Sequence, residues 1–283
     1  MANGTSHAIN QAAKVAGPAL GGLLLTVLEP QSAFLVNAAV SALAAALLAT
    51  LPGDLRPPPE AGAAGGGTPW RQVGGALALV RARPPLRLAI ALMSAGFFAL
   101  FFYDALIPLL TRALGHSERV FGAAIAAVGA GGVLGAAVLA AASEGRPFAR
   151  MGAGYLVSGA AVGGLGLAAT LGAAIPAPAF VALFAVLGLS SAATVVPYRT
   201  VLQNHTPPEA VGRVTALGEA ASTTTLLVAH LIGAAIAAAA GVGAAFAAGG
   251  LGRLSLALLA WIGSGRTQWR GLKEPRRGCF TGV

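Results

Sequence analysis

The run Ala13-Lys14-Val15-Ala16-Gly17-Pro18-Ala19-Leu20-Gly21-Gly22 decides how the rest of the chain is interpreted. It opens an apolar helix, and Gly17 and Gly21 stand four positions apart, so both share one helical face with Ala13. In lipid a face of small residues lets two backbones approach closely. Pro18 removes a backbone donor and loosens the helix. A generic packing face would explain the run equally well, so the other stretches of the sequence are needed to interpret it.

The composition indicates a membrane protein. Hydrophobic residues make up 56% of the 283 and charged residues only 10%, whereas a soluble domain carries about 25% charged residues. The chain therefore has too little polar surface to fold in water. Forty glycines also suit transmembrane helices. We predict an all-α integral membrane protein, and the lone Cys279 offers neither a disulfide nor a metal cluster.

The number of crossings follows from the length of each apolar run, because a bilayer core of about 30 Å needs roughly 20 apolar residues. Eight spans are predicted, at 9–28, 31–51, 87–110, 120–142, 149–172, 177–199, 214–239 and 242–263. Residues 52–68 are rich in proline and glycine and are predicted to form a linker. Residues 69–83 are predicted to form a short basic amphipathic helix on the membrane surface, ending at Pro84-Pro85.

Arginine and lysine set the predicted orientation, because cytoplasmic loops carry an excess of them. With eight spans, the basic residues of 56–87, 143–150, 199–213 and 266–277 all fall on one side, and the other side has only Arg112 and Arg119. We therefore expect a multi-pass protein of the cell (cytoplasmic) membrane with these basic segments in the cytoplasm. The net charge of +9 is then explained by topology, so the expected partner is the lipid bilayer and not nucleic acid.

The opening run and three further stretches carry a family resemblance. The run Gly17-Pro18-x-x-Gly21-Gly22 is similar to the signature in the fifth helix of the major facilitator superfamily. Ala2-Asn3 and Gln11 resemble the entry to that helix. Residues 120–136, with Gly131 and Gly135 four apart, resemble its eighth helix. Residues 197–214 resemble the end of its tenth helix and the following cytoplasmic loop, through Pro197, Arg199, Gln203, Pro207, Pro208, Glu209, Gly212, Arg213 and Val214. Together they point to the export branch that includes enterobactin exporters, the transmembrane secretion effector group.

This resemblance implies a twelve-helix fold of which the chain carries helices 5–12. Residues 1–51 would be the last two helices of the N-domain, 52–86 the cytoplasmic linker, 87–263 a six-helix C-domain and 264–283 a basic cytoplasmic tail. The chain is thus expected to be N-terminally truncated and not to transport by itself. Gly131 and Gly135 would dock against the Gly17/Gly21 face. The loop at 143–150 departs from the family pattern, because it matches the family's cytoplasmic motif only in part.

Ionisable residues inside spans are functional candidates, since a central charge costs about 2.5–3.5 kcal/mol on the translocon scale. Asp104 follows Tyr103 and could accept a proton or pair with a cationic substrate, or it could sit at the outer interface, where Pro108 ends the span. Glu219 and His230 are eleven residues apart and share one helical face.

Thr223 lies between Glu219 and His230, so the three could form a proton relay or a polar cavity wall. Alternatively His230 is a packing residue, and Glu219 pairs with Arg213 or Arg199 near the cytoplasm. Asn10 and Gln11 lie at a comparable depth in the repeat-related helix and are further cavity candidates. Arg253 has no carboxylate nearby in sequence and stays without an assigned role.

No motif of a metalloprotease, a serine hydrolase or a nucleotide-binding loop is present in the sequence, so we expect no enzyme and no cofactor. The prediction is a secondary active transporter that exports a small amphipathic or siderophore-like molecule by alternating access, driven by protons. A non-transporting membrane fragment or scaffold is the alternative.

Overall fold

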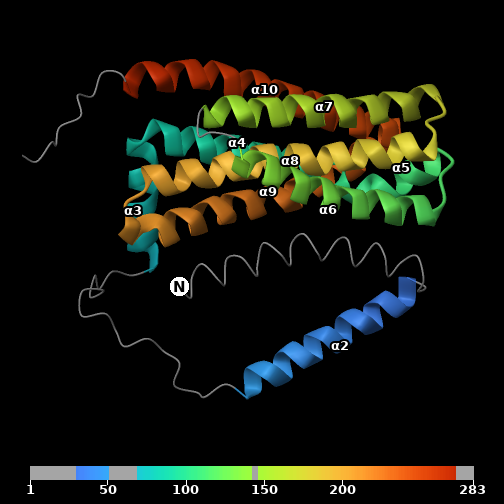
Figure 1. Ribbon diagram of the computed structural model, residues 1–283, viewed down its shortest axis with the longest axis horizontal. Helices are drawn as coiled ribbons and strands as arrows, with labels where there is room; N and C mark the ends of the chain where they lie inside the picture. The colour runs from blue at the N-terminus through green and yellow to red at the C-terminus, as the bar shows by residue number, and fades with distance from the viewer. Residues whose placement is uncertain (1–29, 51–68, 142–145, 272–283) are drawn as a thin grey trace, which may run out of the picture.

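The computed structural model describes residues 30–50, 69–141 and 146–271 (Figure 1). Within these ranges the chain is helical and contains no strand. The elements are α2 (Pro30–Ala49), α3 (Pro69–Ala82), α4 (Pro84–Phe101), the 3-10 turn η1 (Asp104–Leu106), α5 (Ile107–Ala113), α6 (Glu118–Ala141), α7 (Pro147–Leu171), α8 (Ala177–His205), the 3-10 turn η2 (Pro208–Ala210), α9 (Val211–Ala240) and α10 (Val242–Gly271).

Six stretches of the described chain are long and apolar enough to cross a bilayer: Pro84–Ala113, Glu118–Leu139, Pro147–Leu171, Ala177–His205, Pro208–Ala240 and Val242–Ser264. They coincide with the last six predicted spans, which confirms the all-helical membrane fold. The predicted span 31–51 overlaps α2, whose apolar part is the shorter helix Phe34–Ala49. The predicted span 9–28 lies outside the described residues.

The helix boundaries follow from local chemistry. Prolines occupy the first or second position of α4, α7 and α8, where the missing N–H would have no intrahelical partner anyway. Gly172 and Gly241 follow the C-terminal ends of α7 and α9 with φ of 64° and 87°. A glycine adopts this left-handed conformation without strain, which allows the tight reversals into α8 and α10.

The short helix α3 crosses one end of the bundle at a steep angle to the long helices (Figure 1). It packs on α9 and α4, with Ala76 and Val80 buried. The Arg83 guanidinium, just after α3, donates a hydrogen bond to the His205 carbonyl at the last residue of α8. A cation there complements the unpaired carbonyls of a helix end. We call this end, which also carries Arg199 and Arg213, the basic end.

Two helix pairs make the closest contacts, α7 with α10 and α6 with α8. Glycines permit this approach: a Cβ on Gly166 of α7 would meet the backbone of Ala247 and Gly243 in α10. A Cβ on Gly131 or Gly135 of α6 would likewise meet the Ala185 or Leu189 carbonyl of α8. The α6 glycine face therefore packs on α8, and the expected docking onto Gly17 and Gly21 stays a prediction. Gly17 and Gly21 themselves lie outside the described residues.

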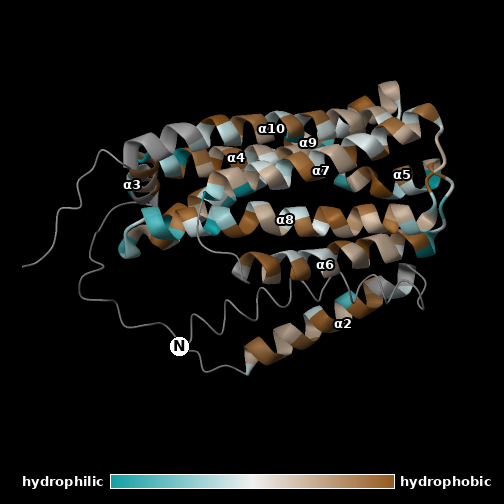
Figure 2. Ribbon diagram, turned by 45° about the horizontal axis from the view of Figure 1, so that its top comes forward, coloured by the Kyte–Doolittle hydropathy of each residue, from teal (hydrophilic) through white to brown (hydrophobic). Residues whose placement is uncertain are grey.

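The long helices consist mostly of hydrophobic residues (Figure 2), and many of these face outward. Large side chains such as Leu134, Leu227, Leu231 and Leu258 are more than half exposed. A soluble protein rarely exposes apolar patches of this extent, whereas in lipid they face a solvent as apolar as themselves. The bundle is therefore built for a bilayer.

Candidate functional site

The first long span is broken near the end of the bundle opposite to the basic end. Helix α4 stops at Phe101, and the 3-10 turn η1 and the short helix α5 continue the span to Ala113. Pro108 explains the break, because it has no N–H to donate to the carbonyl four residues earlier, which is that of Asp104. Asp104 thus lies where the span loses regular helical hydrogen bonding.

Asp104 and His230 meet at this break. His230 Nε2 lies 2.8 Å from Asp104 Oδ1, and both side chains are about one-third exposed. The same Oδ1 accepts a hydrogen bond from the Ala105 N–H at 2.7 Å. The Phe101 ring packs against the imidazole with ring centres 5.6 Å apart. The structure therefore joins two of the predicted candidates across 126 sequence positions.

The backbone of α9 is brought close to the break by Gly233, one turn after His230. A Cβ at this position would collide with the carbonyl of Phe102. Absence of a side chain therefore lets α9 lie directly against the non-helical segment. His230 and Gly233 form one contact between α9 and the broken span.

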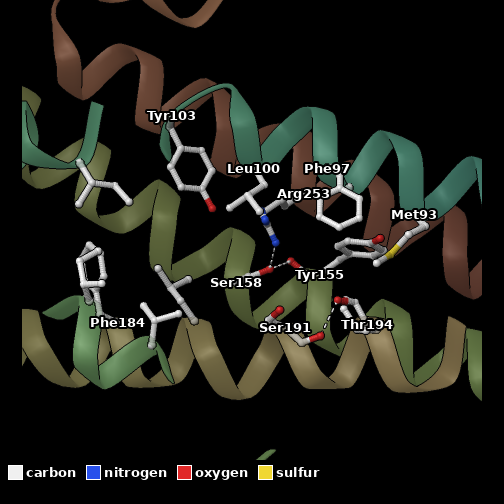
Figure 3. Close-up of a pocket in the computed structure, with 16 residues that line it drawn as sticks. Met93, Phe97, Leu100, Tyr103, Tyr155, Ser158, Phe184, Ser191, Thr194 and Arg253 are labelled. Carbon is white, nitrogen blue, oxygen red and sulfur yellow. Dashed lines mark hydrogen bonds between the residues drawn. The ribbon is translucent and has the colours of Figure 1, made fainter. Parts of the chain in front are cut away.

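A cavity of about 300 Å³ opens beside the break (Figure 3). Side chains from α4, α6, α7, α8 and α10 line it, together with Tyr103 and Ile107 of the broken segment. The walls are mainly apolar and aromatic, with Phe97, Tyr155 and Phe184 among them. Small-molecule sites are commonly concave and mainly apolar, with a few polar groups that orient the ligand.

Arg253 of α10 supplies the charge of this cavity. The residue is only 8% exposed, and its Nη1 donates a hydrogen bond to Ser158 Oγ of α7 at 2.9 Å. Its guanidinium carbon lies 5.8 Å from the centre of the Tyr103 ring, within the range of a cation–π contact. This residue had no assigned role from the sequence, and its contacts come from elements far away in the chain.

A second cavity, of about 350 Å³, lies toward the basic end and is lined by Tyr198, Arg199, Glu219 and Ser222 among others. It shares five lining residues with the first, namely Met93, Phe97, Val128, Ser191 and Val195. The two cavities therefore adjoin and follow the length of the bundle from Arg253 toward the basic end.

Glu219 lies at the basic end and faces Arg199, with 3.8 Å between Oε1 and Nη2. The ion pair with Arg199 is one of the alternatives that the sequence left open. The Glu219 side chain is 61% exposed. His230 sits about 16 Å further along α9, from a rise of about 1.5 Å per residue. Glu219 and His230 therefore share α9 but have different partners, Arg199 and Asp104.

The other predicted residues are placed as follows. Thr223 is exposed, and its neighbour Ser222 lines the second cavity instead. Gln203 and Gly212 are exposed at the basic end, where Arg213 donates a hydrogen bond to the Glu209 carbonyl at 3.1 Å. The remaining candidates Asn10, Gln11, Gly17, Pro18, Gly21 and Gly22 lie outside the described residues.

Sequence reasoning missed several polar residues of the first cavity: Tyr155, Ser158, Ser191 and Thr194. Each is a neutral hydroxyl in an apolar span, and such hydroxyls are often satisfied by the carbonyl one turn back. The spacing of Tyr155 and Ser158 on one face was the available signal, but a partner on another helix cannot be read from it.

The fold and the site define a polytopic α-helical membrane protein with an internal cavity, a buried arginine and a carboxylate–imidazole pair. The family model of the Major Facilitator Superfamily matches residues 1–173, more than half of the chain. The chain belongs to this superfamily, whose members are transporters. No curated protein and no solved structure was matched.

Proposed function

We propose that this transporter exports a small amphipathic or siderophore-like molecule from the cytoplasm, driven by protons that enter in the opposite direction. The proposal assigns residues 87–263 to the C-terminal half of the transporter and the basic end to the cytoplasm of a cell membrane. The asymmetric distribution of arginines supports this orientation. The two adjoining cavities support a substrate path that starts at the basic end.

The observation that carries the proposal is the contact between Asp104 and His230. When Asp104 is ionised and His230 is protonated, the two groups, 2.8 Å apart and only one-third exposed, attract one another more strongly than they would in bulk water. A proton that reaches Asp104, or one that leaves His230, removes one charge of the pair. The contact between α9 and the broken span then loses its electrostatic attraction.

Such a contact can couple protons to movement. In alternating access, two parts of a transporter rock about a site near the bilayer midplane. With the basic end in the cytoplasm, the pair lies toward the outer side, from which the driving protons arrive. Protonation of Asp104 would loosen the outer contact, and release of that proton from Asp104 would restore it. Glu219, at the inner end of the same helix, is proposed as a second proton-binding group.

The test is proton-driven transport in inside-out vesicles from cells that express the gene product from its native locus, so that any coding sequence in frame with residue 1 is included. An imposed pH gradient should drive uptake of an amphipathic fluorescent probe. Asp104→Asn and His230→Gln should abolish uptake driven by the gradient but retain exchange of the probe at equal pH. The control is Arg112→Gln, a substitution of an exposed residue of α5.

Two results would count against the proposal. Full gradient-driven uptake by Glu219→Gln combined with His230→Ala would refute a proton role for α9. Absence of any probe movement in every version would instead favour a non-transporting membrane scaffold.

A further inference from the structure

Arg253 is a buried cation that the proposed proton mechanism does not use. The side chain lies in α10 and the residue is 8% exposed. Among the described residues no carboxylate lies within ion-pair distance of it. Its Nε is buried without a hydrogen-bond partner. A guanidinium carries five N–H donors, so the bond to Ser158 and the contact with Tyr103 leave further donors available.

The charge points into the first cavity. Figure 3 shows the guanidinium between Tyr103 and Ser158, at the side of the space that faces Phe184 and Ser191. Charged groups inside a membrane are costly and are retained where they pair or bind. Among the described residues that line this cavity, Arg253 is the one with a charged side chain.

Three of the hydroxyls that line the cavity are already engaged by backbone carbonyls. Ser158 donates to the Gly154 carbonyl at 2.8 Å, Thr194 to that of Ser191 at 2.8 Å and Tyr155 to that of Leu92 at 2.8 Å. Their hydrogens are therefore unavailable for a ligand in this conformation. The guanidinium of Arg253 provides the charged donors for an anionic group, which are stronger than the neutral hydroxyls.

The rest of the cavity wall favours a ligand whose remaining part is apolar. Phe97 and Leu100 of α4 face Phe184 of α8 across the space (Figure 3), and Leu187 of α8 also lines it. Such surfaces gain free energy by removing apolar area from water. A volume of about 300 Å³ is enough for one or two fused rings.

We infer that this cavity is a binding site for amphipathic organic anions, with the carboxylate of the ligand on the Arg253 guanidinium and its apolar rings between Phe97 and Phe184. The inference narrows the substrate class of the proposed function and takes its biological meaning from it. Binding itself requires neither proton coupling nor transport.

Equilibrium dialysis tests the inference with the chain in phosphatidylcholine nanodiscs, and empty nanodiscs correct for partition into lipid. The probes are 2-naphthoate and its neutral counterpart 2-naphthylmethanol, which share one ring system. The wild type should bind 2-naphthoate about tenfold more tightly or better, because a hydrogen bond to a charged group is stronger than a neutral one. Equal affinity for the two probes would overturn the inference.

Substitutions locate the effect. Arg253→Gln should remove the preference for the anion while changing the affinity for the alcohol by less than about twofold. Arg253→Lys should retain part of the preference, because it keeps the charge but loses the planar fork. Arg71→Gln, which makes the same charge change on the exposed face of α3, should bind both probes as the wild type does.

The outcomes separate the two proposals. If Arg253→Gln fails to fold, the comparison of the two probes on the wild type still decides. A preference for 2-naphthoate that survives in folded Arg253→Gln would refute the role of Arg253. A carboxylate from residues outside the described chain would neutralise Arg253 and abolish the preference in the wild type, which would also overturn the inference. Since no gradient is applied, loss of transport in vesicles leaves this result unaffected.

Discussion

Asp104 and His230 are the residues whose interaction matters most. Both side chains are about one-third exposed, and the contact spans two separate helices. Partial burial reduces solvent screening, so the pair should contribute more than an ion pair on the surface. Arg112 and Glu118 supply that comparison, since they lie 3.1 Å apart with more than 70% of each side chain exposed.

A double-mutant cycle with Asp104→Asn and His230→Gln should give a coupling free energy of about 1 kcal/mol or more. The corresponding cycle on Arg112→Gln and Glu118→Gln should give less than about 0.5 kcal/mol, because water screens that pair. Unfolding in mixed micelles, followed by tryptophan fluorescence, measures both. Equal coupling in the two cycles would mean that the Asp104–His230 contact has no special energetic weight.

At this scale the sequence identified the groups and offered the Glu219–Arg199 pair as one alternative, but it did not predict the Asp104–His230 pair. Asp104, Glu219 and His230 stand out because each is ionisable within an apolar span. The spacing on α9 suggested that Glu219 and His230 act together, yet His230 pairs with Asp104 and Glu219 faces Arg199. Pairing across helices depends on how the bundle packs, and local periodicity contains no information on it.

At the scale of elements, the broken span positions the site. Pro108 prevents α4 and α5 from forming one helix and holds Asp104 in a 3-10 turn. The sequence indicated an end to the span near Pro108, whereas the structure shows an interruption followed by the short helix α5. A proline breaks the hydrogen-bond ladder without preventing a new start, so the two outcomes look alike in sequence.

Pro108→Ala should restore the missing donor and favour a continuous helix. Asp104 would then rotate away from His230, because a regular turn points its side chain elsewhere. The coupling free energy of the Asp104–His230 cycle should fall to about zero in this background. Pro178→Ala is the matched control, since Pro178 lies in the first turn of α8, where a missing N–H breaks no intrahelical bond. An unchanged coupling in Pro108→Ala would contradict this account of the break.

Glycine positions on α7 differ sharply in the space around them. A Cβ on Gly166 would meet backbone atoms of α10, while nothing lies within 4 Å of one on Gly164. Gly166→Ala should therefore destabilise the bundle by about 1–3 kcal/mol through overpacking. Gly164→Ala should be neutral or stabilise by up to about 1 kcal/mol through helix propensity. The same micelle unfolding assay compares them, and similar effects of the two changes would contradict the α7–α10 packing.

At the scale of the whole molecule, the arrangement of charges defines the orientation that the proposed function requires. The composition and the apolar lengths were sufficient to predict the six spans that the structure describes, because a bilayer restricts both. The cavity could not be predicted in this way. Its walls combine residues of six helices, and Arg253 reaches Ser158 across 95 positions.

Cysteine labelling checks the orientation. In a Cys279→Ser background, Ser117→Cys in the loop after α5 should react with a membrane-impermeant maleimide added to intact cells. Asn204→Cys at the basic end should react only after the membrane is opened. Both positions are exposed, so each is accessible on its own side. The opposite pattern of labelling would reverse the predicted topology and the direction of transport.

The central claim, that protons and substrate move in opposite directions through one mechanism, is tested most directly by a proton flux driven by the substrate alone. Proteoliposomes of the native-locus gene product, loaded with a pH-sensitive dye, are given a gradient of the amphipathic probe and no pH gradient. We predict an opposing proton flux that disappears in Asp104→Asn with His230→Gln. Movement of the probe without any change in internal pH would contradict the account.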